Sequence, residues 1–161
     1  MNMKLTTLCY LKQNGNYLMI KKNDDGGQSA GKYLGVGGKL EPGESPDECA
    51  KREIKEETGY EVLDLKLRGI VTFLSDVWED EIMFLYSAEQ LEGELRNDCD
   101  EGRLYWIEED KVLDLPAWEG DKYFLKPLLE GEDDIQLKLV YKGDDLMEVY
   151  RDGAMLLCRF E

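Results

Sequence analysis

The segment from residue 38 to residue 60 constrains this chain more than any other, because its glycine, glutamate and arginine residues stand at fixed intervals. It reads GKLEPGESPDECAKREIKEETGY. Gly38 is followed after five residues by Glu44 and after seven more by Arg52, which opens the run Arg-Glu-Ile-Lys-Glu-Glu-Thr-Gly. At an average usage of about 5% per residue type, so many fixed positions coincide by chance on the order of once in a billion. Even in a Glu-rich chain, the spacing therefore indicates a selected motif.

This segment also carries the signals for both ends of a helix. Ser45 is a good N-cap, Pro46 takes the first helical position, and Glu48, three residues after the cap, completes a capping box. Gly59 is suited to end the helix in the left-handed conformation. The sequence therefore predicts a helix over Pro46–Thr58.

The predicted helix carries three acidic side chains on one stripe. Glu53, Glu56 and Glu57 are spaced i, i+3, i+4, which places them on one side of a helix, where like charges repel. A solvated acidic face is the ordinary outcome of such a stripe. Here the glycine-dense segment Gly35–Gly38 lies shortly upstream and can fold back over the helix. Because carbonyl and carboxylate oxygens are the donors that Mg²⁺ and Mn²⁺ prefer, we expect a site for a divalent cation.

The charge balance and the missing residue types narrow the function classes. With 36 acidic and 20 basic residues the net charge is −16, which leaves no basic surplus for a nucleic-acid partner. A nucleotide remains compatible if divalent cations lie between the two sets of negative charge. The chain has no histidine and its four cysteines lie far apart, which argues against zinc sites and against Ser-His-Asp or Cys-His catalysis. The N-terminal MNMKLTTLCYLK has no apolar run typical of a signal peptide or membrane span, so we expect a cytoplasmic protein without membrane contact.

Alternating apolar patterns and turn residues predict one α+β domain over residues 1–161, with helical cover on a mixed sheet. Asn14-Gly15 is typical of a hairpin turn between the first two strands, and Pro127 is a weak point in a second helix. A short helical turn is expected over Glu109–Leu113 and the second helix over Asp121–Leu129. A further strand is expected in the last nine residues, GAMLLCRFE. The other expected strands are Thr6–Leu11, Tyr17–Lys21, Leu65–Leu74, Glu81–Tyr86, Leu104–Ile107, Ile135–Tyr141 and Leu146–Tyr150.

The fixed spacing resembles the Nudix box, G-x5-E-x7-R-E-U-x-E-E-x-G-U, in which U is a bulky apolar residue. Residues 38–60 match it at every position. Tyr60 is the weakest match, because an aliphatic residue is more usual at that position. The resemblance implies a Nudix hydrolase, an enzyme that uses divalent metal to cleave a nucleoside diphosphate linked to another group. It also implies the Nudix fold, an α/β/α sandwich in which helices flank a mixed sheet.

By position in that motif, the resemblance gives the acidic stripe the catalytic roles. Glu56 and Glu57 are expected to bind the metal, and Glu53 to bind it or to act as general base for the attacking water. Arg52 and Glu44 are expected to support the site by holding the loop and the helix together.

Outside the box, the chain resembles the MutT-like 8-oxo-dGTP diphosphatase branch of the family. The matching stretches are Leu5–Leu8, Ile20–Lys22, Gly31–Lys39, Cys99–Gly102 before Trp106, Pro116–Asp121 and Lys142–Asp144. This similarity implies that Glu101 reaches the metal, that Trp118 stacks on a purine and that Asp121 contacts the base edge. The Nudix box itself implies that the Gly37 carbonyl is a further metal ligand. The other residues expected at the substrate are Thr7, Lys22, Leu34, Gly35, Gly38 and Lys39.

Residue type alone leaves other interpretations open for these side chains. Trp118 is either an exposed stacking platform or a buried core residue. Asp121 is either a base contact or the N-cap of the second helix. Lys22 and Glu101 are otherwise ordinary surface charges.

The resemblance predicts a Mg²⁺-dependent nucleoside triphosphate pyrophosphohydrolase that converts 8-oxo-dGTP to 8-oxo-dGMP and pyrophosphate, a monomer or homodimer with a small nucleotide as its partner. Two departures bear on base selectivity: Leu34 offers no hydrogen-bonding side chain, and Gly120 stands where some relatives carry a second acid. The nearest alternative is a Nudix hydrolase of ADP-ribose, a dinucleotide or another modified dNTP. A non-catalytic nucleotide-sensing domain is more distant, because all three carboxylates of the stripe are present.

Overall fold

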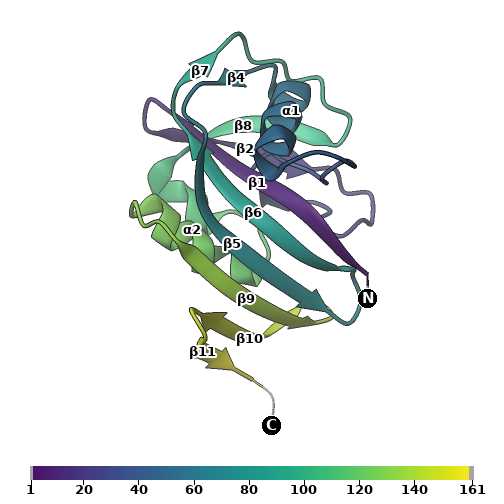
Figure 1. The fold of residues 1–161 in the computed structure, drawn as a ribbon. Coiled ribbons are helices and arrows are strands. Elements are labelled where there is room, and N and C mark those ends of the chain that lie inside the picture. Colours follow the sequence, from purple (N-terminus) through teal and green to yellow (C-terminus); the bar gives the residue numbers. More distant parts are fainter. Residues whose placement is uncertain (1, 160–161) are drawn as a thin grey trace.

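The computed structural model describes residues 2–159, and its main feature is a mixed sheet of nine strands (Figure 1). The strands lie in the order β11-β10-β9-β5-β6-β1-β2-β3, with β8 also paired to β2. The pairs β1–β6 and β5–β9 are parallel, and the other pairs of this sheet are antiparallel. The strands of this sheet are β1 Met3–Gln13, β2 Asn16–Lys22, β3 Tyr33–Leu34, β5 Lys66–Ser75, β6 Asp80–Ala88, β8 Gly102–Glu108, β9 Ile135–Lys142, β10 Asp145–Arg151 and β11 Ala154–Cys158. Two short strands, β4 Glu61–Val62 and β7 Leu91–Glu92, pair with each other apart from it. The helices are α1 Pro46–Thr58 and α2 Lys122–Leu129, and the 3₁₀ turns are η1 Glu109–Asp114 and η2 Glu119–Asp121.

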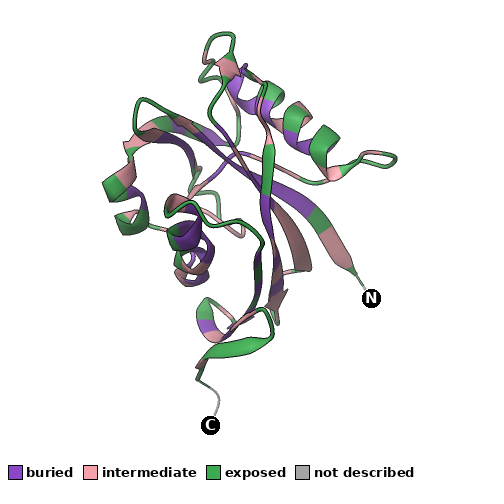
Figure 2. Ribbon diagram, turned by 60° about the vertical axis from the view of Figure 1, so that its left-hand side comes forward, coloured by how far each residue is buried: buried purple, intermediate pink, exposed green. Residues whose placement is uncertain are grey.

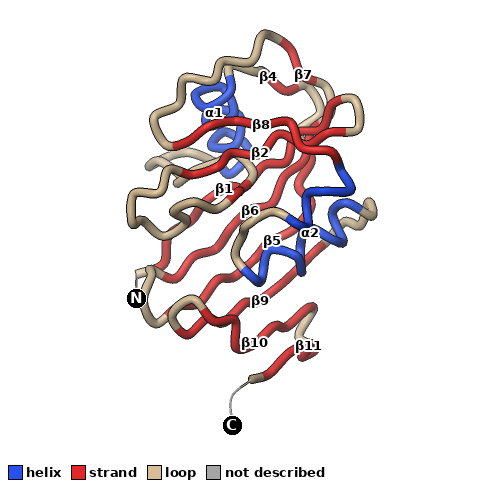
Figure 3. Tube along the Cα trace, turned by 180° about the vertical axis from the view of Figure 1, so that it is seen from behind, coloured by secondary structure: helices blue, strands red, loops and turns tan. Residues whose placement is uncertain are grey.

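Helices cover both faces of this sheet, which confirms the expected α/β/α arrangement. Views from opposite sides show α1 in front of the sheet in Figure 1 and α2 in front of it in Figure 3. Because side chains alternate along a strand, β1 contributes to both cores. Cys9 packs in the core that contains Ile54 of α1, whereas its neighbour Tyr10 packs in the core that contains Phe124 of α2. Figure 2 shows the resulting pattern on α1, with buried residues toward the sheet and exposed residues outward.

The ends of α1 coincide with the predicted ones, because their determinants are local. The Ser45 hydroxyl accepts the Glu48 backbone N–H at 3.2 Å, and the Glu48 carboxylate accepts the Ser45 backbone N–H at 3.1 Å. Gly59 takes a φ of 85° and donates its N–H to the Lys55 carbonyl. The capping box and the left-handed terminator therefore fix the position of the acidic stripe along the chain.

The predicted strands are confirmed, with ends that move by up to three residues. The turn at Asn14 and Gly15 has positive φ at both positions, 53° and 78°, as a two-residue hairpin of type I′ requires. The C-terminal strand is found as β11, although residues 160 and 161 of the predicted GAMLLCRFE strand lie outside the described residues. The second helix begins one residue later than predicted, because the chain before it forms the 3₁₀ turn η2.

The glycine segment after β3 runs between β1 and β2. These two strands pair only next to their hairpin, from Leu11 opposite Leu18 to Gln13 opposite Asn16. Farther from the turn, β1 pairs instead with the glycine segment, through a bridge between Cys9 and Val36. The segment thereby lies within the sheet and beneath α1. No helix in residues 2–159 combines the length and apolar character needed to cross a bilayer.

Candidate active site

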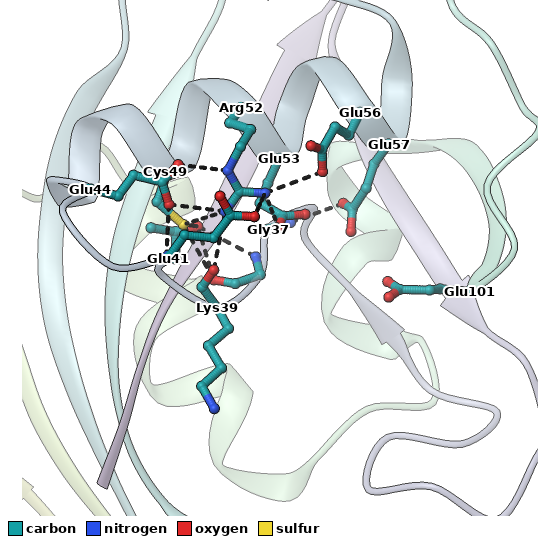
Figure 4. Close-up of polar contacts among 12 residues, drawn as sticks. Gly37, Lys39, Glu41, Glu44, Cys49, Arg52, Glu53, Glu56, Glu57 and Glu101 are labelled. Atoms are coloured by element: carbon teal, nitrogen blue, oxygen red, sulfur yellow. Dashed lines mark hydrogen bonds and ion pairs between the residues drawn. The ribbon is translucent and has the colours of Figure 1, made fainter.

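Arg52 joins the loop before α1 to the acidic stripe on the helix. Its Nε and Nη2 donate to the two carboxylate oxygens of Glu44 at 2.6 and 3.0 Å, which makes a bidentate ion pair. Its Nη1 donates to Glu53 Oε1 at 2.8 Å and to Glu56 Oε2 at 3.2 Å, and its Nη2 donates to the Lys39 carbonyl at 3.1 Å (Figure 4). The bonds from Arg52 lower the pKa of Glu44 to about 2. One guanidinium therefore holds the loop against the stripe.

Glu57 is the buried member of the stripe, with 5% of its surface exposed. Its Oε2 accepts the Gly37 backbone N–H at 3.0 Å. Burial, followed by the negative charge of Glu53, raises the pKa of Glu57 to about 8. Burial also raises the pKa of Glu53. A positive charge placed beside these two groups would stabilise their ionised forms.

A side chain on either of two glycines beside the stripe would meet a neighbouring group. A Cβ on Gly38 would lie 2.5 Å from the carboxyl carbon of Glu53, and a Cβ on Gly37 would overlap the carbonyl oxygen of Thr7. The Gly38 carbonyl accepts the Thr7 backbone N–H at 2.8 Å. The glycine segment therefore lies directly between β1 and the stripe, as its residue types predict.

Glu101 reaches the same region from the turn before β8. Its Oε2 accepts a hydrogen bond from Lys22 Nζ of β2 at 3.0 Å. Figure 4 shows the carboxylates of Glu53, Glu56 and Glu57 side by side along α1, with that of Glu101 facing them from across a gap. The ammonium group of Lys22 acts against the raised pKa of Glu57, but more weakly than burial and Glu53. Acidic groups from two parts of the chain thus meet beside one lysine.

A pocket of about 460 Å³ opens beside these groups. Its lining includes Glu57, Glu101 and Lys22, and it also includes Trp118 and Asp121 from the segment before α2. A volume of this size is within the range of pockets that hold small ligands. The pocket therefore joins a charged region to an aromatic one.

Trp118 is buried, with 7% of its surface exposed, so the expectation of an exposed platform is wrong. Its ring makes edge-to-face contacts with Phe73 and Tyr141, at centroid distances of 5.9 and 5.1 Å. Its Nε1 donates to the Ser29 hydroxyl at 3.1 Å, and Lys32 Nζ lies 4.7 Å from the ring centroid. The ring therefore belongs to the core and to the pocket wall at once.

Asp121 is also buried in the pocket wall, and its interpretation as a helix N-cap is wrong. It has helical φ and ψ of −61° and −32°, and its side chain makes no capping hydrogen bond. Burial, followed by the negative charge of Glu81, raises the pKa of Asp121 to about 8. The 3₁₀ turn before α2 places this carboxyl group toward the pocket instead of the helix end.

The comparison with protein families agrees with this geometry. The model of the NUDIX domain matches residues 3–128, which include the whole acidic stripe, the glycine segment and the residues around Trp118. The chain belongs to the Nudix family.

Individual relatives place it among the MutT-like Nudix hydrolases. It is 34% identical over 129 residues to the oxidized purine nucleoside triphosphate hydrolase of Danio rerio, which covers 79% of this chain and 80% of that protein. An uncharacterized Nudix hydrolase of Bacillus subtilis is 28% identical over 130 residues, which covers 78% of this chain and 79% of the relative. The crystal structure of a mutator MutT protein from Bacillus halodurans superimposes with a TM-score of 0.83 at 31% identity, over 92% of this chain and 97% of that one.

Most of the residues that the Nudix resemblance singled out come together. The expected substrate residues that line the pocket are Thr7, Lys22, Leu34, Gly35, Gly38, Trp118 and Asp121. Lys39 is not among the lining residues: it is exposed, and Figure 4 shows its side chain directed away from the carboxylates. Among the expected metal ligands, Gly37, Glu57 and Glu101 line the pocket, whereas Glu53 and Glu56 bond to Arg52.

The donor set fits the divalent cations, such as Mg²⁺, that Nudix hydrolases generally use. Carboxylate and carbonyl oxygens are the ligands that hard cations prefer, and Gly38 leaves free the space that the Glu53 carboxylate occupies. In residues 2–159 no three acidic or thiol side chains are oriented so that they could already hold an ion. Glu56 is 59% exposed at its side chain and can turn from Arg52 without repacking. The residues fit the metal once carboxylates of the stripe turn toward it.

Several pocket residues carried no signal in the sequence. Glu81 and Met83 of β6 and Phe73 of β5 line the pocket, together with Lys4 at the start of β1. Their places depend on the pairing of β1 with β6 and of β5 with β6, which join distant segments. Strand alternation alone could show that Glu81 and Met83 share a face, but not that this face forms a Nudix substrate pocket.

Proposed function

We propose that this Nudix hydrolase is a Mg²⁺-dependent nucleoside triphosphate pyrophosphohydrolase that acts on oxidised purine deoxynucleotides such as 8-oxo-dGTP. The observation that carries the proposal is the single pocket whose wall includes both the acidic groups around Glu57 and the buried ring of Trp118. A triphosphate and a purine are joined in one molecule, so a substrate of this class needs both surfaces together. Relatives named as oxidized purine nucleoside triphosphate hydrolases, in Danio rerio and in Mus musculus at 32% identity, support the same substrate class.

In the proposed reaction, water attacks phosphorus and a phosphoanhydride bond breaks, so that the triphosphate and water yield the monophosphate and pyrophosphate. Glu56, Glu57 and Glu101, with the Gly37 carbonyl, would hold the cation, and of the two roles expected for Glu53 we assign it that of general base. A divalent cation bound there supplies charge compensation for the phosphates, which the acidic side chains would otherwise repel.

The chain's own residues then divide the remaining tasks. Glu53 keeps its Oε1 against Arg52, so its Oε2 is the atom that we assign to accept a proton from the attacking water. Glu44 and Arg52 keep the loop in place, and Lys22 is positioned to contact a phosphate oxygen. Trp118 and Asp121 would position the base.

The reaction is tested with purified protein, Mg²⁺ and a panel of 8-oxo-dGTP, the four ordinary dNTPs and ADP-ribose, with products resolved by chromatography. We expect monophosphate and pyrophosphate, with 8-oxo-dGTP preferred. Glu57→Gln should lower kcat by at least about 100-fold while the protein stays folded, because it removes a buried anionic oxygen donor. Glu61→Gln, an exposed change just beyond α1, is the matched control and should keep full activity. Near wild-type turnover by Glu57→Gln would contradict the proposed site.

Leu34 favours a second candidate, another Nudix substrate, because this pocket residue offers the base no hydrogen bond. Preferential cleavage of ADP-ribose, a dinucleotide or a different modified dNTP in the same panel would support it. Absence of turnover with every nucleotide despite binding would instead indicate a nucleotide sensor. We also propose that the protein is cytoplasmic, a monomer or homodimer, and free of nucleic-acid partners.

A further inference from the structure

Glu81 places a second carboxylate in the wall of the pocket that Asp121 also lines. It lies at the start of β6, where the parallel pairing of β6 with β1 sets it opposite Lys4. The Thr6 hydroxyl donates to Glu81 Oε2 at 2.6 Å, and Lys4 Nζ lies 3.6 Å from Oε1. Only 12% of the Glu81 side chain is exposed. The carboxylate is therefore held in one orientation, with Oε1 able to accept a further hydrogen bond.

Asp121, by contrast, receives no side-chain hydrogen bond within the described residues. It is 7% exposed, and Glu81 is the charged residue that contributes most to its raised pKa. Lys32 and a hydrogen bond from the Trp118 backbone act in the opposite direction, but more weakly. With a backbone group as its one donor, the carboxyl group can accept a further hydrogen bond from a bound group.

The surroundings of the two acids indicate the kind of ligand. Phe73, Met83, Leu139 and the Trp118 ring contribute apolar surface to the same pocket. A flat apolar group that carries N–H donors along one edge would satisfy both the apolar wall and the two acceptors. The side chain nearest to Glu81 with a positive charge, Lys4, already donates to Gln28 Oε1 at 3.1 Å.

We propose that Glu81 is a specificity-determining residue that acts with Asp121 to select purines whose ring N–H and adjacent exocyclic amino group both donate hydrogen bonds. Oε1 of Glu81 accepts from one of these donors and the Asp121 carboxyl group from the other. A purine with the same ring N–H but no amino group leaves one buried acceptor unpaired. The inference rests on the proposed function, because it takes this pocket as the site of the base.

The 2-amino group separates 8-oxo-dGTP from 8-oxo-dITP, which are otherwise identical. The wild-type protein should prefer 8-oxo-dGTP by about 10- to 100-fold in kcat/KM, as expected for one hydrogen bond to a charged acceptor. Glu81→Gln should reduce the preference to less than about threefold, mainly through KM, because the new amide can turn an N–H toward the amino group. Glu79→Gln, an exposed change two residues earlier, should leave the preference unchanged. An unchanged preference in folded Glu81→Gln would overturn the inference.

Binding of the monophosphates dGMP and dIMP, measured by calorimetry, separates this inference from the proposed function. Tighter binding of dGMP that depends on Glu81 supports the inference even if no triphosphate is hydrolysed. Absence of hydrolysis would contradict only the proposed reaction. Hydrolysis of 8-oxo-dGTP together with equal binding of dGMP and dIMP would overturn the inference alone. If Glu81→Gln does not fold, Thr6→Val removes the hydroxyl that orients Glu81 and should also lower the ratio; an unchanged ratio counts against the inference.

Discussion

The close contact between Gly38 and Glu53 predicts that Gly38→Ala will separate activity from stability. The new Cβ would lie 2.5 Å from the Glu53 carboxyl carbon and 2.6 and 2.8 Å from its oxygens. Because the obstructing atoms are the end of a flexible side chain, Glu53 can rotate away. Rotation breaks the 2.8 Å hydrogen bond from Arg52, which costs about 1 kcal/mol. Replacing glycine by alanine restores about 0.4–1 kcal/mol by restricting the unfolded chain, so stability should change by less than about 1 kcal/mol.

The expected loss of activity is much larger. Glu53 is the residue to which we assign the proton from the attacking water, and displacement of a catalytic group by about 1 Å can lower the rate about 100-fold. The assay measures kcat with 8-oxo-dGTP and Mg²⁺ beside thermal unfolding of the same preparation. The midpoint should shift by no more than about 4 °C while kcat falls by about two orders of magnitude.

Gly37→Ala is the matched comparison, because its Cβ would meet the Thr7 carbonyl oxygen, a backbone atom of β1. A strand backbone cannot turn aside as a side chain does, so this variant should lose about 1–3 kcal/mol or more. The reasoning is refuted if Gly38→Ala keeps full activity. It is equally refuted if Gly38→Ala is as unstable as Gly37→Ala, since the obstruction would then not be the Glu53 side chain.

Two further predictions concern the aromatic side of the pocket. Trp118→Ala should lower the free energy of unfolding, measured by chemical denaturation, by about 3–5 kcal/mol, because the ring packs against Phe73 and Tyr141. The same variant should raise KM more than it lowers kcat. An unchanged KM would restrict Trp118 to a structural role. Asp121→Asn should stabilise the protein at pH 7.5 by up to about 5 kcal/mol and have little effect at pH 4. Burial raises the folded pKa of Asp121 to about 8, so its unfavourable contribution is absent below the unfolded pKa and grows as pH rises toward 8. Unfolding curves at both pH values test the sign, and equal effects at the two values would contradict it.

The features that sequence predicted best depend on short stretches of chain. The ends of α1 follow from Ser45, Glu48 and Gly59, whose capping contacts span at most a few residues. The hairpin at Asn14 and Gly15 follows in the same way from residues that accept positive φ. By contrast, the two-residue strands β3, β4 and β7 carry no periodic pattern, because tertiary pairing alone defines them.

The environment of the predicted site residues depended on the tertiary structure. Residue type alone could not decide whether Trp118 is an exposed stacking platform or a buried core residue. In the structure its ring packs in the core and also lines the pocket. The N-cap interpretation of Asp121 failed because η2 precedes α2 and directs the carboxyl group elsewhere. Lys39 belongs to the motif-bearing loop by sequence, yet its contribution there is a carbonyl that accepts from Arg52.

The pocket contains two acidic regions with different electrostatic requirements. The sequence indicated the first region as a functional site, but it did not indicate the second. Around α1, the carboxylates share a single helix, and Arg52 and Lys22 lie beside them, so the same spacing that bunches the charges also marks a cation site. Glu81 and Asp121 line the same pocket only because β6 pairs with β1 while η2 folds back toward the sheet. A cation suits the first region, since its oxygens can turn toward a common point. Uncharged N–H donors suit the second, because Lys4 already offsets part of the charge of Glu81 and the apolar wall disfavours a hydrated ion. Under the proposed function, a triphosphate that binds with its divalent cation suits the first region, and an amino-bearing base suits the second. A base without the amino group leaves an acceptor of the second region unpaired.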